Sequence, residues 1–126
     1  MTDFKVLLVW QKAHALALAV YRAASSLPEE ERYGLASRLR RGSVSVVSNV
    51  AEGSGRGSDR EFARFIDIAR GAAVELECQL LLAGDLGYID LDLRDSLVQQ
   101  TEEVSRMLSG LRRRLRQSPL LVARSS

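Results

Sequence analysis

The chain has 126 residues, of which 46% are hydrophobic and 27% charged, so it is long enough for one self-supporting domain and too apolar for a disordered segment. Its single cysteine, Cys78, excludes an internal disulfide and fits a reducing compartment. No apolar stretch reaches the roughly 18 residues that span a bilayer, and the first residues carry no signal-peptide pattern, so we expect a soluble cytoplasmic protein without a membrane partner.

The first predicted helix spans about residues 5–25, where apolar residues recur at three- and four-residue steps. Its expected buried stripe is Val6, Val9, Trp10, Ala13, Ala17, Val20, Tyr21 and Ala24. A second apolar set lies outside that stripe: Leu7, Leu8, Leu16 and Leu18. Because a helix that is apolar on more than one side must bury the extra face, this set favours self-association.

The second predicted helix opens at Pro28, since proline suits a first turn and the three glutamates that follow complement the helix dipole. The glycine-rich segment 53–57 should end it. Its expected core residues are Leu35, Leu39, Gly42, Val46 and Val50. Beside them runs a stripe of small residues, which would let another helix approach closely: Gly42, Ser45, Asn49 and Gly53.

The third predicted helix begins with Ser58-Asp59-Arg60-Glu61, a capping box in which the serine hydroxyl and the glutamate carboxylate satisfy free backbone donors. Its apolar positions are Phe62, Phe65, Ile66, Ala69, Ala73, Leu76, Leu80 and Ala83, and Gly84 and Gly87 end it. Residues 88–90 form a connector, and the fourth helix runs over about residues 92–117. Its coiled-coil-like seam is Leu97, Thr101, Val104, Leu108, Leu111 and Leu115.

Four long helices joined by short loops predict an all-α, antiparallel up-down-up-down four-helix bundle. We expect the bundle to occupy residues 1–117 and a frayed C-terminal tail to occupy residues 118–126.

Charge alternates in blocks, with net values of −1 over residues 1–31, +4 over 32–70, −7 over 71–103 and +6 over 104–126. In an up-down-up-down bundle, one pole would collect Lys5, Lys12, Arg56, Arg60, Arg64, Arg112, Arg113, Arg114 and Arg116. The other would collect Glu29, Glu30, Glu31, Asp85, Asp90, Asp92 and Asp95. A basic pole attracts phosphate backbones through counterion release. Helix-dipole preference alone would explain the last arginines of the fourth helix, but not Arg60 and Arg64 near a helix start.

A second polar cluster comprises Arg38, Arg41, Asn49, Glu52, Arg64, Glu75 and Glu77. Folding the third helix back on the second should place Arg38 or Arg41 beside Glu75, and Arg64 near Asn49 and Glu52. We interpret these residues as inter-helix ion pairs and hydrogen bonds that set register, with paired carboxylates for acid–base or metal chemistry as the alternative. His14 is the only histidine, which excludes the Glu-x-x-His pattern of di-iron bundles, and we expect no catalytic residue, metal or cofactor.

Seven segments occur in a specific order between Val6 and Tyr88: VWQKA at 9–13, PEEERYGL at 28–35, RRGSVS at 40–45, SNVAEG at 48–53, EFARF at 61–65, ELE at 75–77 and LGY at 86–88. In this order they resemble the bacterial four-helix-bundle family encoded in intervening sequences of large-subunit ribosomal RNA genes. The resemblance implies a homopentamer. It also implies kinship with the accessory proteins of diversity-generating retroelements, which are basic pentameric bundles that engage nucleic acid and a reverse transcriptase. Two departures are Gly42, where the family commonly has alanine, and Arg38, where glutamine is frequent.

The sequence therefore predicts a non-enzymatic, homo-oligomeric bundle that binds RNA or DNA backbone through its basic pole. The alternative is a protein-interaction or scaffold module that docks a protein partner and does not bind nucleic acid directly.

Overall fold

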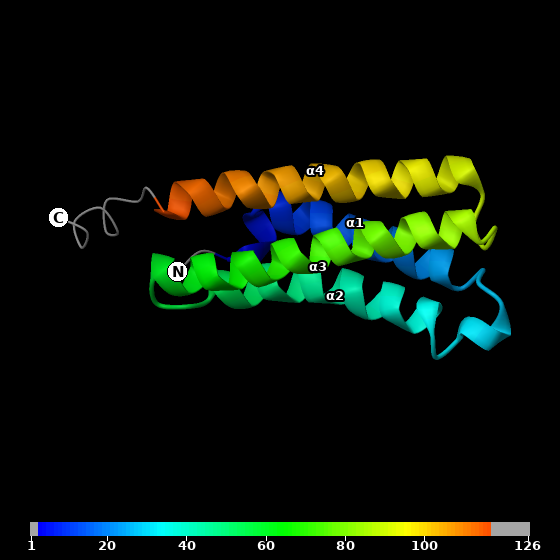
Figure 1. The fold of residues 1–126 in the computed structure, drawn as a ribbon. Helices are drawn as coiled ribbons and strands as arrows, with labels where there is room; N and C mark the ends of the chain where they lie inside the picture. Colours follow the sequence, from blue (N-terminus) through cyan, green and yellow to red (C-terminus); the bar gives the residue numbers. More distant parts are fainter. Residues whose placement is uncertain (1–2, 117–126) are drawn as a thin grey trace.

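The computed structural model describes residues 3–116, which form four long antiparallel helices and two short 3-10 turns (Figure 1). In chain order these elements are η1 (Phe4–Val6), α1 (Leu8–Ala24), η2 (Glu29–Glu31), α2 (Leu35–Ser54), α3 (Asp59–Asp85) and α4 (Leu91–Arg116). Within residues 3–116 there is no strand, and the predicted all-α four-helix bundle is confirmed. The expected tail, residues 118–126, lies outside the described residues.

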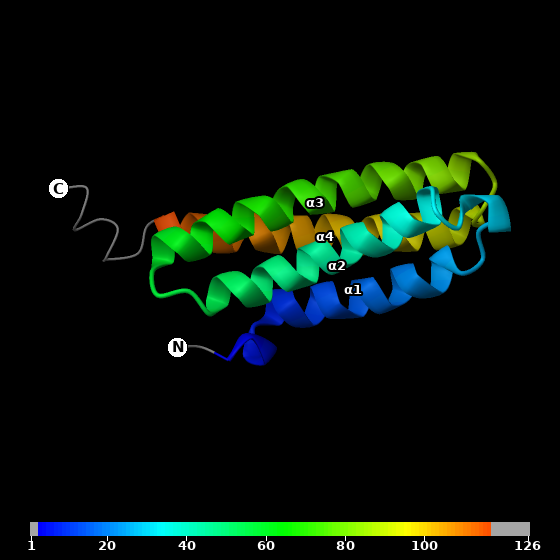
Figure 2. The same cartoon turned by 90° about the horizontal axis from the view of Figure 1, so that it is seen from below.

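The helices pack in a square, since α1 contacts α2 and α4, and α3 contacts the same two helices. Two views at right angles place the start of α1, the α2–α3 turn and the end of α4 at one end of the bundle (Figures 1 and 2). Turn η2 and the α3–α4 connector lie at the other end. The predicted arrangement of the two poles is therefore present in the fold.

The seam of α4 matches the predicted heptad pattern. Leu97, Val104 and Leu108 are almost completely buried, and Leu111 is half-buried against the core. Thr101 is also fully buried, and its hydroxyl donates to the Leu97 carbonyl at 2.7 Å, so this polar group needs no partner from another helix.

The buried face of α1 differs from the predicted stripe. Leu16 is 1% exposed and belongs to the core, whereas the stripe residues Val6 and Tyr21 are 67% and 45% exposed. The helix begins only at Leu8, after turn η1, and packs on two neighbours at once, which moves the buried face toward Leu16 and Ala23. The expectation that Leu16 lies outside the core is therefore wrong, while Leu8 and Leu18 are exposed as expected.

The predicted helix start at Pro28 is also wrong, because Pro28 opens only the 3-10 turn η2 and α2 begins at Leu35. Gly34, with φ −107° and ψ −114°, separates the two segments. The carboxylate of Glu31 accepts a hydrogen bond from the Leu35 amide at 3.0 Å, so a side chain from the preceding turn caps α2.

Two local features confirm how α3 is bounded. The Ser58 hydroxyl accepts from the Glu61 amide at 3.1 Å, which is one half of the predicted capping box. The Glu61 carboxylate, however, pairs with Arg64 at 3.2 Å instead of turning back to Ser58. At the other end, Gly87 adopts φ +77°, and the Tyr88 amide donates to the Ala83 carbonyl at 3.0 Å, a Schellman cap.

Helices α2 and α3 approach each other closely at Gly53. A Cβ atom on Gly53 would lie 2.8 Å from Cβ of Phe65 and 2.9 Å from Cδ1 of Phe62. No side chain fits at this position unless the helices move apart, so this part of the predicted small-residue stripe has a steric cause. At Gly42 the same atom would meet Gln79 at 3.5 Å, an ordinary contact.

Candidate nucleic-acid interface

The basic pole comprises residues 3–12, 49–67 and 106–116, which carry ten basic and five acidic side chains, a net formal charge of +5. The opposite pole, residues 22–41 and 75–95, carries six basic and nine acidic side chains, a net charge of −3. The bundle is therefore electrically polar. The expectation of a simply acidic opposite pole is incomplete, because six arginines also lie there: Arg22, Arg32, Arg38, Arg40, Arg41 and Arg94.

Several cations of the basic pole are paired with acids. Lys5 lies 3.9 Å from Asp3, and Lys12 lies 3.4 Å from Glu103 on α4. These side chains are about half exposed or more, so the pairs contribute little to stability and leave the lysines accessible.

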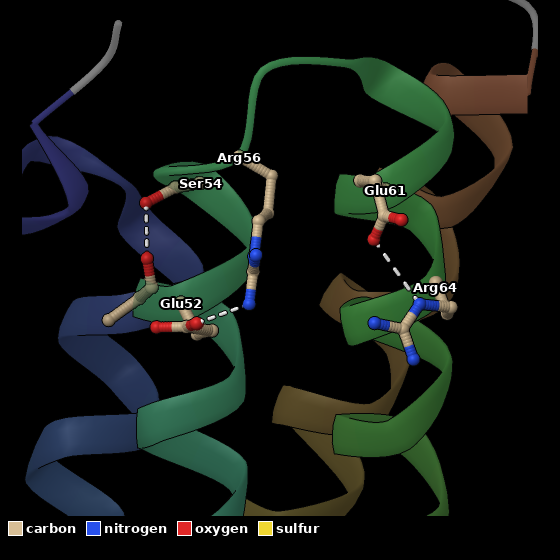
Figure 3. Close-up of polar contacts among 6 residues, drawn as sticks. Glu52, Ser54, Arg56, Glu61 and Arg64 are labelled. Carbon is tan, nitrogen blue, oxygen red and sulfur yellow. Dashed lines mark hydrogen bonds and ion pairs between the residues drawn. The ribbon is translucent and has the colours of Figure 1, made fainter.

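Arg56 in the α2–α3 turn and Arg64 near the start of α3 each pair with an acid three or four residues earlier in the chain. Arg56 lies 2.6 Å from Glu52, and Arg64 lies 3.2 Å from Glu61 (Figure 3). Both guanidinium groups also lie 4.8 Å from the centre of the Phe65 ring. These pairings hold the two arginines around one half-buried aromatic ring beside the turn.

The expected bonds of Arg64 to Asn49 and Glu52 do not form within the described residues. The carboxylate of Glu61, three residues before Arg64, pairs with the Arg64 guanidinium, and the Asn49 amide donates to the Ser45 carbonyl at 2.7 Å. A partner on the same helix face needs no particular packing of the two helices, so the local pair forms in preference to the distant one.

Arg112 joins α4 to α3. Its guanidinium lies 2.9 Å from the Asp67 carboxylate, and its side chain is only 19% exposed, while Arg70 approaches the same carboxylate at 3.2 Å. Partial burial alone would raise the pKa of Asp67, but hydrogen bonds and charge attraction from Arg112, and then from Arg70, hold that pKa below its ordinary value of 3.8. Arg112 therefore has a structural partner 45 residues away, one that sequence spacing did not indicate.

Four arginines of the basic pole are exposed and form no ion pair with any residue between 3 and 116: Arg60, Arg106, Arg113 and Arg114. We refer to them as the free arginines. Arg116 is the last residue of α4, and its side chain lies outside the described part of the structure. The free arginines are the cations that can approach a phosphate without first breaking an ion pair.

The second polar cluster is only partly assembled. Arg38, Arg41 and Glu75 line one groove of about 320 Å³ between α2 and α3, together with Gln79. No ion pair joins either arginine to Glu75 within the described residues, and Glu75 instead accepts from the Gln79 amide at 3.3 Å. Glu77 is half-buried on α3 and joins no ion pair in that same range. The residues are neighbours as expected, but the expected ion pairs are absent from the described chain.

Side chains that could perform chemistry are dispersed. His14 stacks on Trp10 with ring centres 4.7 Å apart, and Cys78 is exposed on α3. No three His, Cys, Asp or Glu side chains between residues 3 and 116 are placed to hold a metal ion. None of the helices in that range combines the length and the apolar character that crossing a membrane requires.

These features define a class: a small antiparallel four-helix bundle whose two ends carry opposite net charge. Residues 5–110 match the family model described as 23S rRNA-intervening sequence protein, and the chain therefore belongs to that family. The bundle is similar to a crystal structure of a protein with unknown function from the S23 ribosomal protein family of Bacteroides thetaiotaomicron, with a TM-score of 0.77 and 22% identity. That similarity covers 82% of this chain and 97% of the other and concerns the fold. No curated protein matches the chain.

Proposed function

We propose that this protein is a non-enzymatic, cytoplasmic bundle that binds the backbone of RNA or DNA through its basic pole. The observation that carries the proposal is the separation of charge, +5 against −3, with the four free arginines at the positive end. A cluster of cations on one surface releases counterions from a phosphate backbone, and this release drives binding without reading sequence.

The aromatic side chains of the basic pole favour contact with phosphates rather than bases. Phe65 is half-buried and flanked by Arg56 and Arg64, and Trp10 is stacked against His14. A base has no open aromatic ring to stack on at this end, so phosphate contacts supply the binding energy.

We further propose that the bundle acts as a homo-oligomer, and specifically as the pentamer implied by the family resemblance. Exposed apolar side chains support self-association, because Leu8 and Leu18 on α1 and Val74 on α3 are 59%, 47% and 66% exposed. Protomers aligned in parallel would place their basic poles in one ring and add their positive fields. Kinship with retroelement accessory proteins belongs to the same proposal.

The alternative function, a protein-interaction or scaffold module, is favoured by one further feature. An apolar groove of about 260 Å³ runs between α1 and α2, lined by Leu18, Val44 and Val47 among others. Capture of a protein partner by an apolar groove would be insensitive to salt, whereas binding to a phosphate backbone weakens as salt rises.

A matched pair of variants tests the proposed function. Arg114→Gln removes a free arginine near the end of α4, and Arg22→Gln removes an exposed arginine in the last turn of α1 at the opposite pole. Both changes remove one charge from a helix end. We expect Arg114→Gln to weaken binding to short duplex DNA and structured RNA in fluorescence anisotropy, and Arg22→Gln to leave it unchanged. Equal effects of the two variants would contradict a site at the basic pole.

A further inference from the structure

Tyr33, in the turn between η2 and α2, has a ring that the fold leaves open. Its side chain is 86% exposed, more than any other large hydrophobic side chain between residues 3 and 116. The guanidinium of Arg32 lies 5.4 Å from the centre of the ring. Packing of the core does not account for Tyr33, because it contributes almost no buried surface.

The turn that carries Tyr33 is tied to two other parts of the bundle. One carboxylate oxygen of Glu31 accepts from the Leu35 amide at 3.0 Å, and the other accepts from the Tyr88 hydroxyl, in the α3–α4 connector, at 3.2 Å. The Gly34 amide donates to the Glu31 carbonyl at 3.0 Å, and a Cβ on Gly34 would lie 2.7 Å from the Glu31 carboxylate. These bonds fix the backbone conformation on both sides of Tyr33. The ring is therefore presented without the entropy cost of ordering a loose loop.

Four arginines, Arg32, Arg38, Arg40 and Arg41, lie in or follow this turn, although the three glutamates of η2 precede it and the pole as a whole is negative. The Arg40 guanidinium donates to the Arg32 carbonyl at 3.4 Å, so the basic first turns of α2 are continuous with the turn that bears Tyr33. Arg38 and Arg41 lie one turn apart on α2, are exposed, and pair with no acid within the described residues. Of the four arginines, only Arg32 has an acidic partner in that range, Glu29 at 3.6 Å, in a highly exposed pair.

We propose that Tyr33 and the arginines around it form a stacking site for single-stranded nucleic acid, separate from the basic pole. An open aromatic ring bordered by arginines is the combination that non-sequence-specific single-strand binders use, with a base on the ring and phosphates on the cations. Duplex bases are already stacked and cannot reach the ring, so the site selects unpaired strands. Helix α2, whose 20 residues span about 30 Å, separates this site from the basic pole.

The inference rests on the proposed nucleic-acid function and adds to it a strand preference and a second site. The test uses a labelled 15-nucleotide oligothymidylate and an abasic oligomer of the same length, bound to the full chain and to Tyr33→Ala, Tyr33→Phe and Leu91→Ala. Leu91 is an exposed apolar residue at the same pole and serves as the control.

We expect Tyr33→Ala to weaken oligothymidylate binding by roughly five- to a hundredfold, the range given by loss of one base–aromatic stack. Tyr33→Phe should restore the affinity, Leu91→Ala should match the wild type, and the abasic oligomer should not respond to any of these changes. The stacking site would be overturned if Tyr33→Ala weakened the affinity for both oligomers equally, or if it left the affinity for both unchanged. If duplex and structured RNA still bind through Arg114 in that case, the proposed function stands without it.

Discussion

The close approach of α2 and α3 makes one pair of substitutions informative: Gly53→Ala and Gly42→Ala, the same chemical change eleven residues apart on one helix. At Gly53 the new methyl group would lie 2.8 Å from Cβ of Phe65, an atom fixed to the α3 backbone. At Gly42 it would lie 3.5 Å from the Gln79 amide oxygen, an ordinary contact at the far end of a side chain. The two positions therefore differ in space and hardly in chemistry.

The magnitudes follow from two opposing effects. Alanine in place of glycine stabilises a helix interior by about 1 kcal/mol, and this gain applies in full at Gly42 and less at Gly53, next to the last residue of α2. Overpacking costs about 1–3 kcal/mol and applies only at Gly53, where the helices must separate. We expect Gly42→Ala to raise the free energy of unfolding by up to about 1 kcal/mol, and Gly53→Ala to lower it by about 1–3 kcal/mol.

Urea unfolding followed by helical circular dichroism, at one fixed protein concentration, measures both changes. The family resemblance agrees with the expected sign at Gly42, where alanine is common. A stabilising effect of Gly53→Ala, or equal shifts in the two variants, would refute the packing of α2 on α3 described here.

Three further predictions concern stability and assembly. Asp67→Asn should lower the free energy of unfolding near neutral pH, because Arg112 and Arg70 stabilise the ionised carboxylate and depress its folded-state pKa. The difference in unfolding free energy from wild type should disappear as the pH falls below 3.8 and through that depressed pKa. Acid titrations of both proteins measure this difference. Leu16→Ala, at a position 1% exposed, should lower the free energy of unfolding in urea by about 2–5 kcal/mol. A loss under about 1 kcal/mol would contradict the burial of Leu16 in the core. Leu18→Glu should leave that free energy almost unchanged but reduce the mass measured by light scattering, and an unchanged oligomer mass would remove Leu18 from the association surface.

The elements that have a regular apolar pattern or depend on a local bond could be predicted closely. The seam of α4 is regular, so its period gave the buried residues, and the Ser58 cap depends only on the amide three residues later. The face of α1 could not be predicted as well, because its apolar residues surround much of the helix. For that reason Leu16, predicted outside the buried stripe, is buried, and Tyr21, predicted inside it, is exposed.

The start of α2 shows a different limit. The pattern of Pro28 and three glutamates is typical of a helix start, yet Glu31 bonds to Leu35 and to Tyr88, 57 residues away. This tertiary contact, between two connecting segments at the same end of the bundle, overrode the local preference, and sequence alone gave no sign of it. The same turn exposes Tyr33, which the predicted helix starting at Pro28 would have included.

The candidate site was predicted at the level of the pole, and the structure resolved it to individual side chains. Topology alone brings the helix ends together, so the basic residues could be grouped from the order of the helices. Which of these residues form no ion pair could not be predicted, because ion pairs depend on side-chain positions. Arg112 pairs with Asp67 and Arg64 pairs with Glu61, while Arg60 stays exposed.

The salt dependence of binding to short duplex DNA is the most direct test of a phosphate-binding basic pole. The affinity of the wild-type chain should fall steeply between about 50 and 200 mM salt, and the slope of log K against log salt should become shallower by about 1.8 in the double variant Arg113→Gln/Arg114→Gln, which removes two phosphate contacts. No measurable binding at about 50 mM salt, or a slope that the double variant leaves unchanged, would contradict a phosphate-binding basic pole.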